Sequence, residues 1–481
     1  MNPFRVLKHV QGDYRKYVES FSLIRSEDVR DAVREAINND ELLWREPYVQ
    51  ITKNFKPAGN LGNLIPAVLH PDCKKVFYRD ENNPASGLID LHQHQHLSIM
   101  AAAAKKNYLV STGTSSGKSF CFFIPIVDQC LRLKGTKGVK AIVVYPMNAL
   151  ANSQYWNMAA RLHGTGLRIG KYTGQTQRTD NEAAETYRKI NGRDEPFDSE
   201  VLSREEMVAN PPDILITNYK MLEYMLVRPI DRQMLNPEYA DALQFIVLDE
   251  AHTYEGRRGA DVAMLIRRVK RRMKARGRVR CVATSATLVK TNDPDHEYNE
   301  VSTFFQQLFG ESIERDAFIK EEEEPLPAVE HFLPVETSGL RSLIENFDPA
   351  TDSKWALAEG MFGRTLAAHE RVPDSLKEML RRSQIYHLVY EALRERPKQA
   401  TELSIELGEA LGREPEDLKP TVDAFLRLGL IADSSGRQVV PIRLHSFFQS
   451  GSKAFRCARC NLAMSARRRS RPTPSRRAAS A

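Results

Sequence analysis

The chain has 481 residues, of which 42% are hydrophobic and 27% are charged, as in ordinary soluble globular proteins. It has no apolar stretch near the ~20 residues of a membrane span, and its first residues lack the apolar core of a signal peptide. Its six cysteines are too scattered for a disulfide framework. These features exclude a disulfide-stapled secreted protein and a membrane protein, and they predict a cytoplasmic location with no membrane partner.

The formal net charge of +7 is concentrated in short segments. Residues 465–481 hold six arginines and no acid, so the charge of the preceding residues is six lower, at +1. A second basic segment, residues 267–280, has nine basic residues and no acid. Such a run is either a solvated helix face or a nucleic-acid contact, and we expect it on a helix and its exit. The net charge alone is poor evidence for a nucleic-acid partner.

The stretch STGTSSGKSF, Ser111–Phe120, lies between an apolar run of strand type and a long apolar segment that predicts a buried helix. Strand, small-residue loop, Gly-Lys-Ser and helix are the context of a phosphate-binding loop. Backbone N–H groups and the helix start would bind nucleotide phosphates there. We expect Lys118 to reach the β and γ phosphates and Ser119 to ligate Mg²⁺. The rest of the predicted loop is Thr112, Gly113, Thr114, Ser115, Ser116 and Gly117.

A second cluster follows the apolar run Phe245–Leu248, which reads as a buried parallel strand. The run ends in an Asp-Glu-Ala-His sequence that starts at Asp249. A carboxylate at the C-terminal end of such a strand lies where an α/β sheet binds its ligands. We therefore expect Asp249 to hold the Mg²⁺ that Ser119 coordinates, and Glu250 to polarise the attacking water.

A third piece is the strand-like run from Arg280, which ends in Ser285-Ala286-Thr287. Together the three signals resemble the superfamily 2 helicases and translocases of the DEAD/DEAH type. Residues 112–119 match that family's motif I, residues 249–252 are a literal DEAH motif II, and residues 285–287 match motif III. The resemblance makes His252 a further catalytic residue, and it makes Ser285 and Thr287 residues that couple hydrolysis to movement.

The resemblance implies an α/β fold, namely a RecA-like P-loop domain with a central parallel sheet. It also implies that the domain uses ATP and Mg²⁺. Thr112 at the first position is common in the family, whereas Ser115 departs from the glycine of many members and restricts the backbone. The chain looks closest to large bacterial DEAH-like helicases of DNA repair and phage defence. The implied partner is nucleic acid, with DNA favoured over RNA.

Smaller motifs follow the family's order. Gln95 resembles the adenine-reading glutamine upstream of motif I. A metal site is a possible interpretation of the three histidines around it, His92, His94 and His96. Their alternate spacing, with no cysteine or acid cluster nearby, disfavours that interpretation. Three strand ends resemble motifs that contact the nucleic-acid backbone, with Pro146 and Asn148 at the first, Thr173 and Gly174 at the second, and Thr217 and Asn218 at the third.

A second RecA-like lobe, which in this family supplies arginines to the transferring phosphate, is expected after Thr287 but is not found. No Gly-Arg pair after Thr287 carries the expected Gln or His, and no second strand–loop–helix series follows. We therefore expect the ATP-binding domain of an ATP-dependent DNA helicase that is weak or inactive by itself, with a second lobe or partner protein acting in trans. The alternative is a non-hydrolysing, ATP-dependent clamp or scaffold on nucleic acid.

In the C-terminal third of the chain, the sequence predicts a small folded module and a tail. Three amphipathic helices between Ser383 and Ile431, followed by a hairpin, form a winged-helix pattern, with a helical packing module that touches no DNA as the alternative. Cys457 and Cys460 are half of a structural zinc site, which needs four ligands, so Zn²⁺ is expected only in a full-length form. The arginine-rich end is either a truncated or frame-shifted product or a basic disordered tail.

The expected organisation has five parts. They are an N-terminal accessory region at 1–84, a RecA-like helicase domain at 85–310, a linker or insert at 311–380, a winged-helix-like module at 381–450, and a zinc-cluster start with a basic tail at 451–481.

Overall fold

The structure is a computed structural model. It describes residues 3–465 except 21–25, 30, 32–34, 36–42, 52–53, 81–82, 114–115, 192–194, 287–290, 292, 327, 337–338, 435–437, 448–453 and 457–462. The chain divides into two units: Phe55–Glu324, here the sheet unit, and Met1–Asn54 with Pro325–Ala481, here the helical unit. No helix among the described residues is both long and apolar enough to cross a membrane.

The sheet unit is built on eight parallel strands in the order β13-β6-β12-β11-β7-β10-β8-β9. The central strands β6, β7, β10, β11 and β12 are buried at every residue, as continuous apolar strands are when helices cover both faces. This confirms the predicted α/β class. The strands are β6 (Tyr108–Ser111), β7 (Ala141–Val144), β8 (Ile169–Tyr172), β9 (Glu200–Val201), β10 (Ile214–Thr217), β11 (Phe245–Leu248), β12 (Arg280–Ser285) and β13 (Phe318–Lys320).

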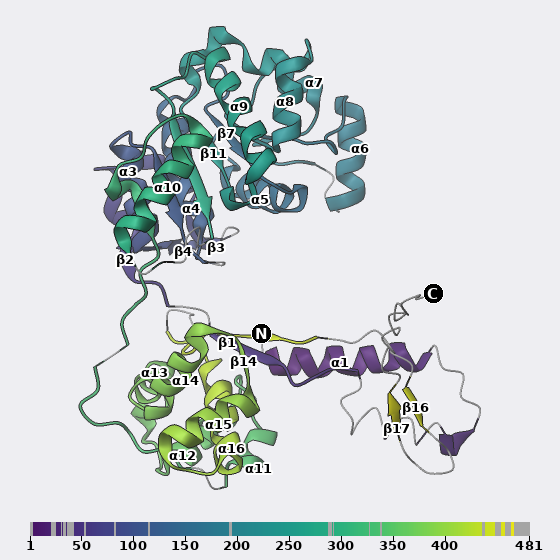
Figure 1. Cartoon of the computed structure of the whole chain (residues 1–481), viewed down its shortest axis with the longest axis vertical. Helices are drawn as coiled ribbons and strands as arrows, with labels where there is room; N and C mark the ends of the chain where they lie inside the picture. The colour runs from purple at the N-terminus through teal and green to yellow at the C-terminus, as the bar shows by residue number, and fades with distance from the viewer. Residues whose placement is uncertain are drawn as a thin grey trace, which may run out of the picture. The chain divides into compact units, whose positions relative to one another are not determined.

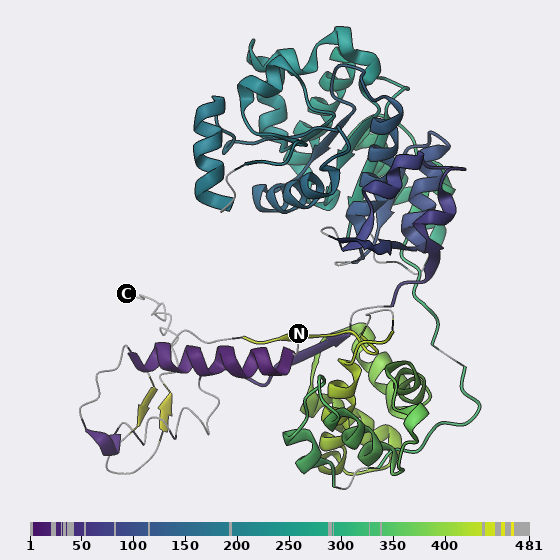
Figure 2. The same ribbon diagram turned by 180° about the vertical axis from the view of Figure 1, so that it is seen from behind.

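Two apolar cores lie on the two faces of this sheet. One joins the strands to α3 (Gln93–Ala103), α4 (Lys118–Arg132) and α5 (Asn148–Leu162). The other joins them to α7 (Arg204–Ala209), α8 (Tyr219–Val227), α9 (Gly256–Arg272) and α10 (Pro294–Phe309). Figures 1 and 2 show the unit from its two sides. The unit also contains α6 (Asp180–Asn191), short 3-10 helices, and the antiparallel pairs β2 (Pro57–Asn60) with β5 (Asp90–His92) and β3 (Tyr78–Asp80) with β4 (Asn83–Leu88).

The helical unit joins two distant parts of the chain. Strand β1 (Tyr48–Ile51) lies between β14 (Lys398–Gln399) and β15 (Ile442–His445) and is antiparallel to both. The helices are α1 (Pro3–Ser20), α11 (Leu340–Glu345), α12 (Ser353–Phe362), α13 (Pro373–Arg381), α14 (Gln384–Glu395), α15 (Ala400–Leu411) and α16 (Pro415–Gly429). A short pair, β16 (Ala454–Arg456) with β17 (Ala463–Ser465), completes the set. The three helices predicted for the winged-helix-like module are present as α14, α15 and α16, and β15, which follows them, pairs with β1.

The unit boundaries differ from the expected domains at two places. Residues 1–54 pack with the C-terminal part rather than forming an accessory region with residues 55–84, because β1 completes the sheet of the helical unit. The expected linker at 311–380 is divided as well. Its strand β13 pairs with β6 in the large sheet, whereas α11 and α12 pack on α16.

Candidate nucleotide-binding site

The phosphate loop leaves the sheet at its interior and ends at a helix start. Strand β6 ends at Ser111, and α4 begins at Lys118. Gly117 before it has a φ of +72°, a conformation that glycine adopts without strain. A Cβ there would also lie 2.5 Å from Gln95 Nε2. The predicted strand–loop–helix is therefore present, with Thr114 and Ser115 of the loop lying outside the described residues.

Lys118 reaches from the phosphate loop to the acidic end of β11. Its side chain is 9% exposed, and its ammonium donates to the Thr112 carbonyl over 3.2 Å. The same Nζ lies 3.3 Å from Glu250 Oε1. The Thr112 and Ser116 hydroxyls, 2.6 Å apart, close the base of the loop. Residues from the two strongest sequence motifs thus meet at the C-terminal edge of the sheet.

Asp249 is held by a threonine that no sequence motif singled out. The Thr284 hydroxyl donates to Asp249 Oδ1 and accepts from the Glu250 backbone N–H over 3.2 Å. Burial raises the pKa of Asp249 to about 6, against the lowering effect of the Thr284 hydrogen bond. Glu250 has a φ of +49°, which is uncommon for a residue with a side chain and marks a constrained backbone.

His252 connects the acidic cluster to β12. Its Nδ1 lies 3.4 Å from Glu250 Oε2 and 3.3 Å from the Ser285 hydroxyl. Ser285 is the last residue of β12 and is fully buried. The second and third motifs are therefore in direct contact, while Thr287 lies outside the described residues.

The residues present fit a nucleotide with a divalent cation. Asp249 offers a buried carboxylate, the ligand type that Mg²⁺ prefers. Ser119, half-buried in the first turn of α4, follows Lys118 at the same edge of the sheet. The N-terminus of α4 adds the positive end of its dipole. No cluster of three or more potential metal ligands occurs among the described residues, and Cys457 and Cys460 lie outside them.

The side chains of Gln95 and His94 form hydrogen bonds with backbone carbonyls of the phosphate loop. Gln95 Nε2 donates to the Gly117 carbonyl over 3.1 Å, and its Oε1 accepts from the His92 backbone N–H over 2.9 Å. His94 Nε2 lies 2.7 Å from the Ser116 carbonyl, and burial lowers the pKa of this imidazole. Both ends of the Gln95 amide are thus engaged within the chain, and its contact with a base stays a prediction.

Glu321 is a site residue that sequence reasoning missed, because it begins the acidic, proline-containing stretch EEEEPLP within residues 311–380, which reads as a linker. Its Oε2 accepts from the Gly113 backbone N–H over 2.6 Å. The position follows β13, whose parallel pairing with β6 carries the carboxylate to the loop. No local pattern signals this contact, which depends on a three-residue strand joining the sheet edge.

The six predicted nucleic-acid contacts follow three neighbouring strands, β7, β10 and β8. The Asn218 amide donates to Asn148 Oδ1 over 2.9 Å. Thr217 and Thr173 are fully buried, and the Thr217 hydroxyl donates to the Tyr172 carbonyl over 2.7 Å. Pro146 is partly exposed and Gly174 exposed. The two threonine side chains therefore serve the fold, which leaves the partly exposed Asn148, Asn218 and Pro146 and the exposed Gly174 for contact with a ligand.

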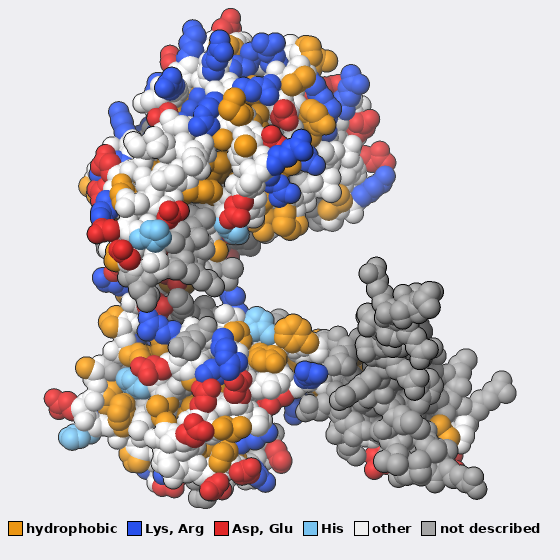
Figure 3. All heavy atoms as spheres, in the orientation of Figure 1, with side chains coloured by type: hydrophobic (Ala, Val, Ile, Leu, Met, Phe, Trp, Pro, Cys, Tyr) orange, Lys and Arg blue, Asp and Glu red, His pale blue; other side chains and the backbone are white. Residues whose placement is uncertain are grey.

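The basic segment 267–280 lies on α9 and its exit, ending where β12 begins. The segment therefore lies toward the N-terminal ends of the parallel strands, whereas the phosphate loop follows the C-terminal end of β6. Figure 3 shows Lys and Arg side chains gathered at the upper end of this unit. Five members of the segment donate to backbone carbonyls, namely Arg267, Lys270, Arg272, Arg278 and Arg280. The geometry favours a structural role for them.

A double variant at two exposed members outside that set tests whether the segment contacts nucleic acid. Arg271→Glu with Lys274→Glu should change the affinity for single-stranded DNA by less than about twofold at physiological salt, because charges beyond a Debye length are screened. Fluorescence anisotropy with a labelled oligonucleotide measures the effect. A tenfold loss together with a flatter salt dependence would restore the nucleic-acid reading of this segment.

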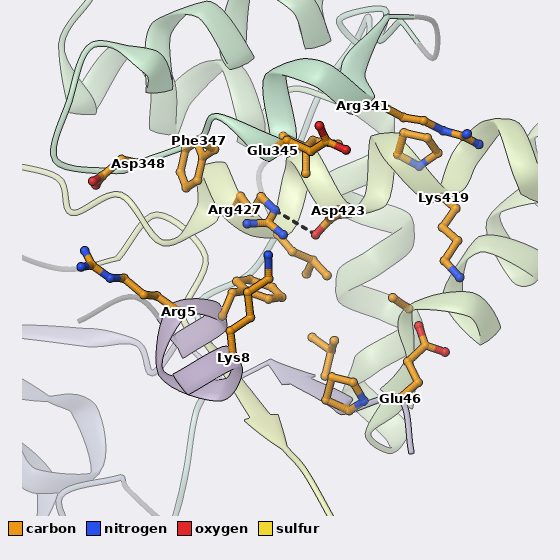
Figure 4. Close-up of a pocket in the computed structure, with 17 residues that line it drawn as sticks. Arg5, Lys8, Glu46, Arg341, Glu345, Phe347, Asp348, Lys419, Asp423 and Arg427 are labelled. Atoms are coloured by element: carbon orange, nitrogen blue, oxygen red, sulfur yellow. Dashed lines mark hydrogen bonds and ion pairs between the residues drawn. The ribbon is translucent and has the colours of Figure 1, made fainter. Parts of the chain in front are cut away.

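In the helical unit, the helix that the winged-helix interpretation would place in a DNA groove is covered. Helices α11 and α12 pack on α16, and a cavity of about 760 Å³ lies where α1 and α11 approach it (Figure 4). Arg427 on α16 pairs with Asp423 over 3.1 Å, and its guanidinium lies 4.8 Å from the Phe4 ring centre. This arrangement favours the packing-module alternative.

The DEAD/DEAH box helicase model matches residues 92–293. Over 565 aligned residues the chain is 27% identical to the Druantia protein DruE of Escherichia coli, covering 94% of this chain and 30% of that protein. It is 30% identical over 203 residues to the ATP-dependent helicase hrq1 of Schizosaccharomyces pombe, covering 41% and 16%. The helicase MrfA bound to DNA is 20% identical, covering 67% and 40%, with a TM-score of 0.40. The chain thus spans less than a third of the curated relatives named here, and its residues 92–293 are a DEAD/DEAH box helicase domain.

Proposed function

We propose that this chain provides the ATP-binding lobe of an ATP-dependent DNA helicase or translocase. The contact between Lys118 Nζ and Glu250 Oε1, 3.3 Å long, carries the proposal. It joins the phosphate loop to the acidic end of β11, with the buried Asp249 carboxylate next to it. DNA is preferred to RNA because of the sequence resemblance to DNA-repair and phage-defence helicases.

Each side chain has a role in this proposal. Asp249 and Ser119 would hold Mg²⁺, which supplies charge neutralisation to the phosphates when bound. Lys118 would orient the β and γ phosphates through its ammonium. Glu250 would accept a hydrogen bond from the attacking water and position it. The Thr284 hydroxyl fixes both acids, since it donates to Asp249 and accepts from the Glu250 N–H.

Hydrolysis by this chain alone would be slow. Within the part that the structure describes, there is no second parallel sheet that could act as a second RecA-like lobe. An arginine supplied by such a lobe contributes ~10³ to 10⁵ in rate. We propose that a second lobe or a partner protein supplies that arginine in trans.

The test compares wild-type protein with the Glu250→Gln variant. Nucleotide binding should be retained, because the phosphate loop and Lys118 are intact. Single-turnover phosphate release should fall by ~10² to 10⁴, the usual contribution of a positioned base. Glu255→Gln, which alters a nearby exposed carboxylate, is the matched control. Equal phosphate release by wild type and Glu250→Gln would contradict the assigned role.

The second candidate is a non-hydrolysing, ATP-dependent clamp or scaffold on nucleic acid, and the lack of a second parallel sheet among the described residues favours it. It predicts nucleotide-dependent DNA binding without phosphate release, whichever partner is added. Brisk, DNA-stimulated turnover by wild type would exclude this candidate and would also contradict the proposed need for a second lobe.

A further inference from the structure

A cavity of about 460 Å³ opens between α5 and α6 of the sheet unit. Its volume is within the range of small-molecule sites. Trp156 and Tyr187 contribute aromatic walls, with their ring centres 5.9 Å apart. Ile190, 70% exposed, adds an apolar side chain, and Asn152 and Gln175 add amides. The lining thus combines flat aromatic surface with hydrogen-bonding groups.

Lys171 of β8 lines this cavity, and the groups that contact its ammonium are neutral. Its ammonium donates to Asn152 Oδ1 over 2.8 Å. It also lies 5.2 Å from the Tyr155 ring centre and 5.5 Å from that of Trp156. Within the described residues no carboxylate lies at ion-pair distance from it, and burial lowers the pKa of this ammonium. A partly desolvated cation without an ion pair is stabilised by an incoming anion.

Glu200 attracts Lys171 only at longer range. Its Oε2 instead accepts hydrogen bonds from the Tyr187 hydroxyl, over 3.0 Å, and from the Phe197 backbone N–H, over 2.9 Å. This carboxylate lies outside the cavity lining. The charge presented to the cavity is therefore that of the lysine, beside aromatic rings on which a flat ligand can stack.

The cavity continues from the proposed nucleic-acid surface. Gln175 and Thr176 in its lining belong to the same loop as Thr173 and Gly174, after β8. Asn152 lies one turn along α5 from Asn148. The lining suits a ligand in which an anionic group is joined to a flat ring. One nucleotide of a strand bound at that edge has both groups, as its phosphate and its base. Single-strand binding proteins combine cations for phosphates with aromatic stacking for bases in the same way.

We propose that this cavity binds one unstacked nucleotide of the bound single strand, with its phosphate at Lys171 and its base against Trp156 and Tyr187. The inference rests on the proposed nucleic-acid binding of this lobe and deepens it. The cavity makes affinity depend on the presence of a base, whereas contacts to the sugar–phosphate backbone alone do not.

The experiment uses the full chain and two oligothymidylates, one intact and one with abasic positions. Lys171→Met should weaken binding of the intact strand about tenfold and reduce the salt slope by about 0.7, the loss of one phosphate contact. Trp156→Ala should cost about tenfold with the intact strand and have little effect with the abasic one. Lys171→Arg should restore binding. Lys189→Met, on the outer face of α6, is the matched control.

A direct readout completes the test. Photocrosslinking of a strand that carries 5-iodouracil should label Trp156 or Tyr187, while binding of a fluorescent ATP analogue shows that each variant is folded. If wild type binds DNA but Lys171→Met and Trp156→Ala bind it equally well, or the crosslinks map elsewhere, the cavity proposal is wrong and the proposed function stands. If wild type binds no single-stranded DNA, the proposed nucleic-acid function itself fails.

Discussion

Lys118→Met should weaken binding of a fluorescent ATP analogue by roughly 10- to 100-fold, the worth of a charge-assisted hydrogen bond. The ammonium is nine-tenths buried and is placed between the Thr112 carbonyl and the Glu250 carboxylate. Removing it takes away the cation that we propose binds the phosphates. It also leaves the Asp249–Glu250 pair with less positive charge, so the pKa of Asp249, already raised by burial, should rise further.

Lys140 provides the control for this variant. It is a second buried lysine of the same unit and pairs with Asp213 over 2.6 Å, next to the N-terminal end of β7. Lys140→Met breaks a buried ion pair and should lower the free energy of unfolding by about 3 kcal/mol, yet leave the nucleotide affinity of the folded protein unchanged. Titration with the analogue and denaturant melts separate the two effects. Wild-type affinity in Lys118→Met would refute the assigned phosphate-loop role.

The sequence predicted those parts of the site that depend on local pattern. The phosphate loop is a contiguous run in which a strand, small residues and a helix start follow one another, and the acidic pair directly follows a buried strand. Parallel strands place their carboxyl ends at one edge, so the meeting of Lys118 with Glu250 follows from the two motifs and the α/β class.

Contacts made by single residues over long range were not predictable in the same way. Glu321 reaches Gly113 because three residues of β13 pair with β6, and an acidic segment gives no sign of such pairing. Thr284 is one residue before the recognised motif, and only the register of β12 beside β11 brings its hydroxyl to Asp249. Gln95 was expected to contact an adenine base, and its hydrogen bond to the phosphate loop was not expected. The sequence gives the position of Gln95 in the chain but not its neighbours in space.

Strand β1 is a structural feature for which the sequence analysis found no signal. Its four residues, Tyr48–Ile51, are flanked by polar segments, and their partners lie in the C-terminal third of the chain. The strand is nevertheless central in the sheet of the helical unit, with hydrogen-bonded neighbours on both sides. Val49 is 2% exposed and Ile51 7%, and both belong to the apolar core of that unit.

Deletion of residues 1–54 should therefore unfold the helical unit and leave the sheet unit folded. Loss of the two buried side chains removes about 1.5–3 kcal/mol each, and each lost ladder hydrogen bond removes roughly 0.5–1.5 kcal/mol more. Together these losses approach the 5–15 kcal/mol that keeps a typical domain folded. The sheet unit contains its own two cores and shares none of these contacts.

Limited proteolysis with mass spectrometry measures this outcome. The deleted chain should yield a resistant fragment near residues 55–324, with residues after 325 digested, whereas wild type should protect both units. Val49→Asp places an unpaired carboxylate in the core and should reproduce the deletion. Gln50→Ala is the matched control, because the neighbouring Gln50 side chain points to the exposed His445 and its loss removes a single 2.7 Å contact. Equal protection of residues 340–445 in the deleted and wild-type chains would show that β1 is dispensable, and the helical unit would then be a contiguous C-terminal domain.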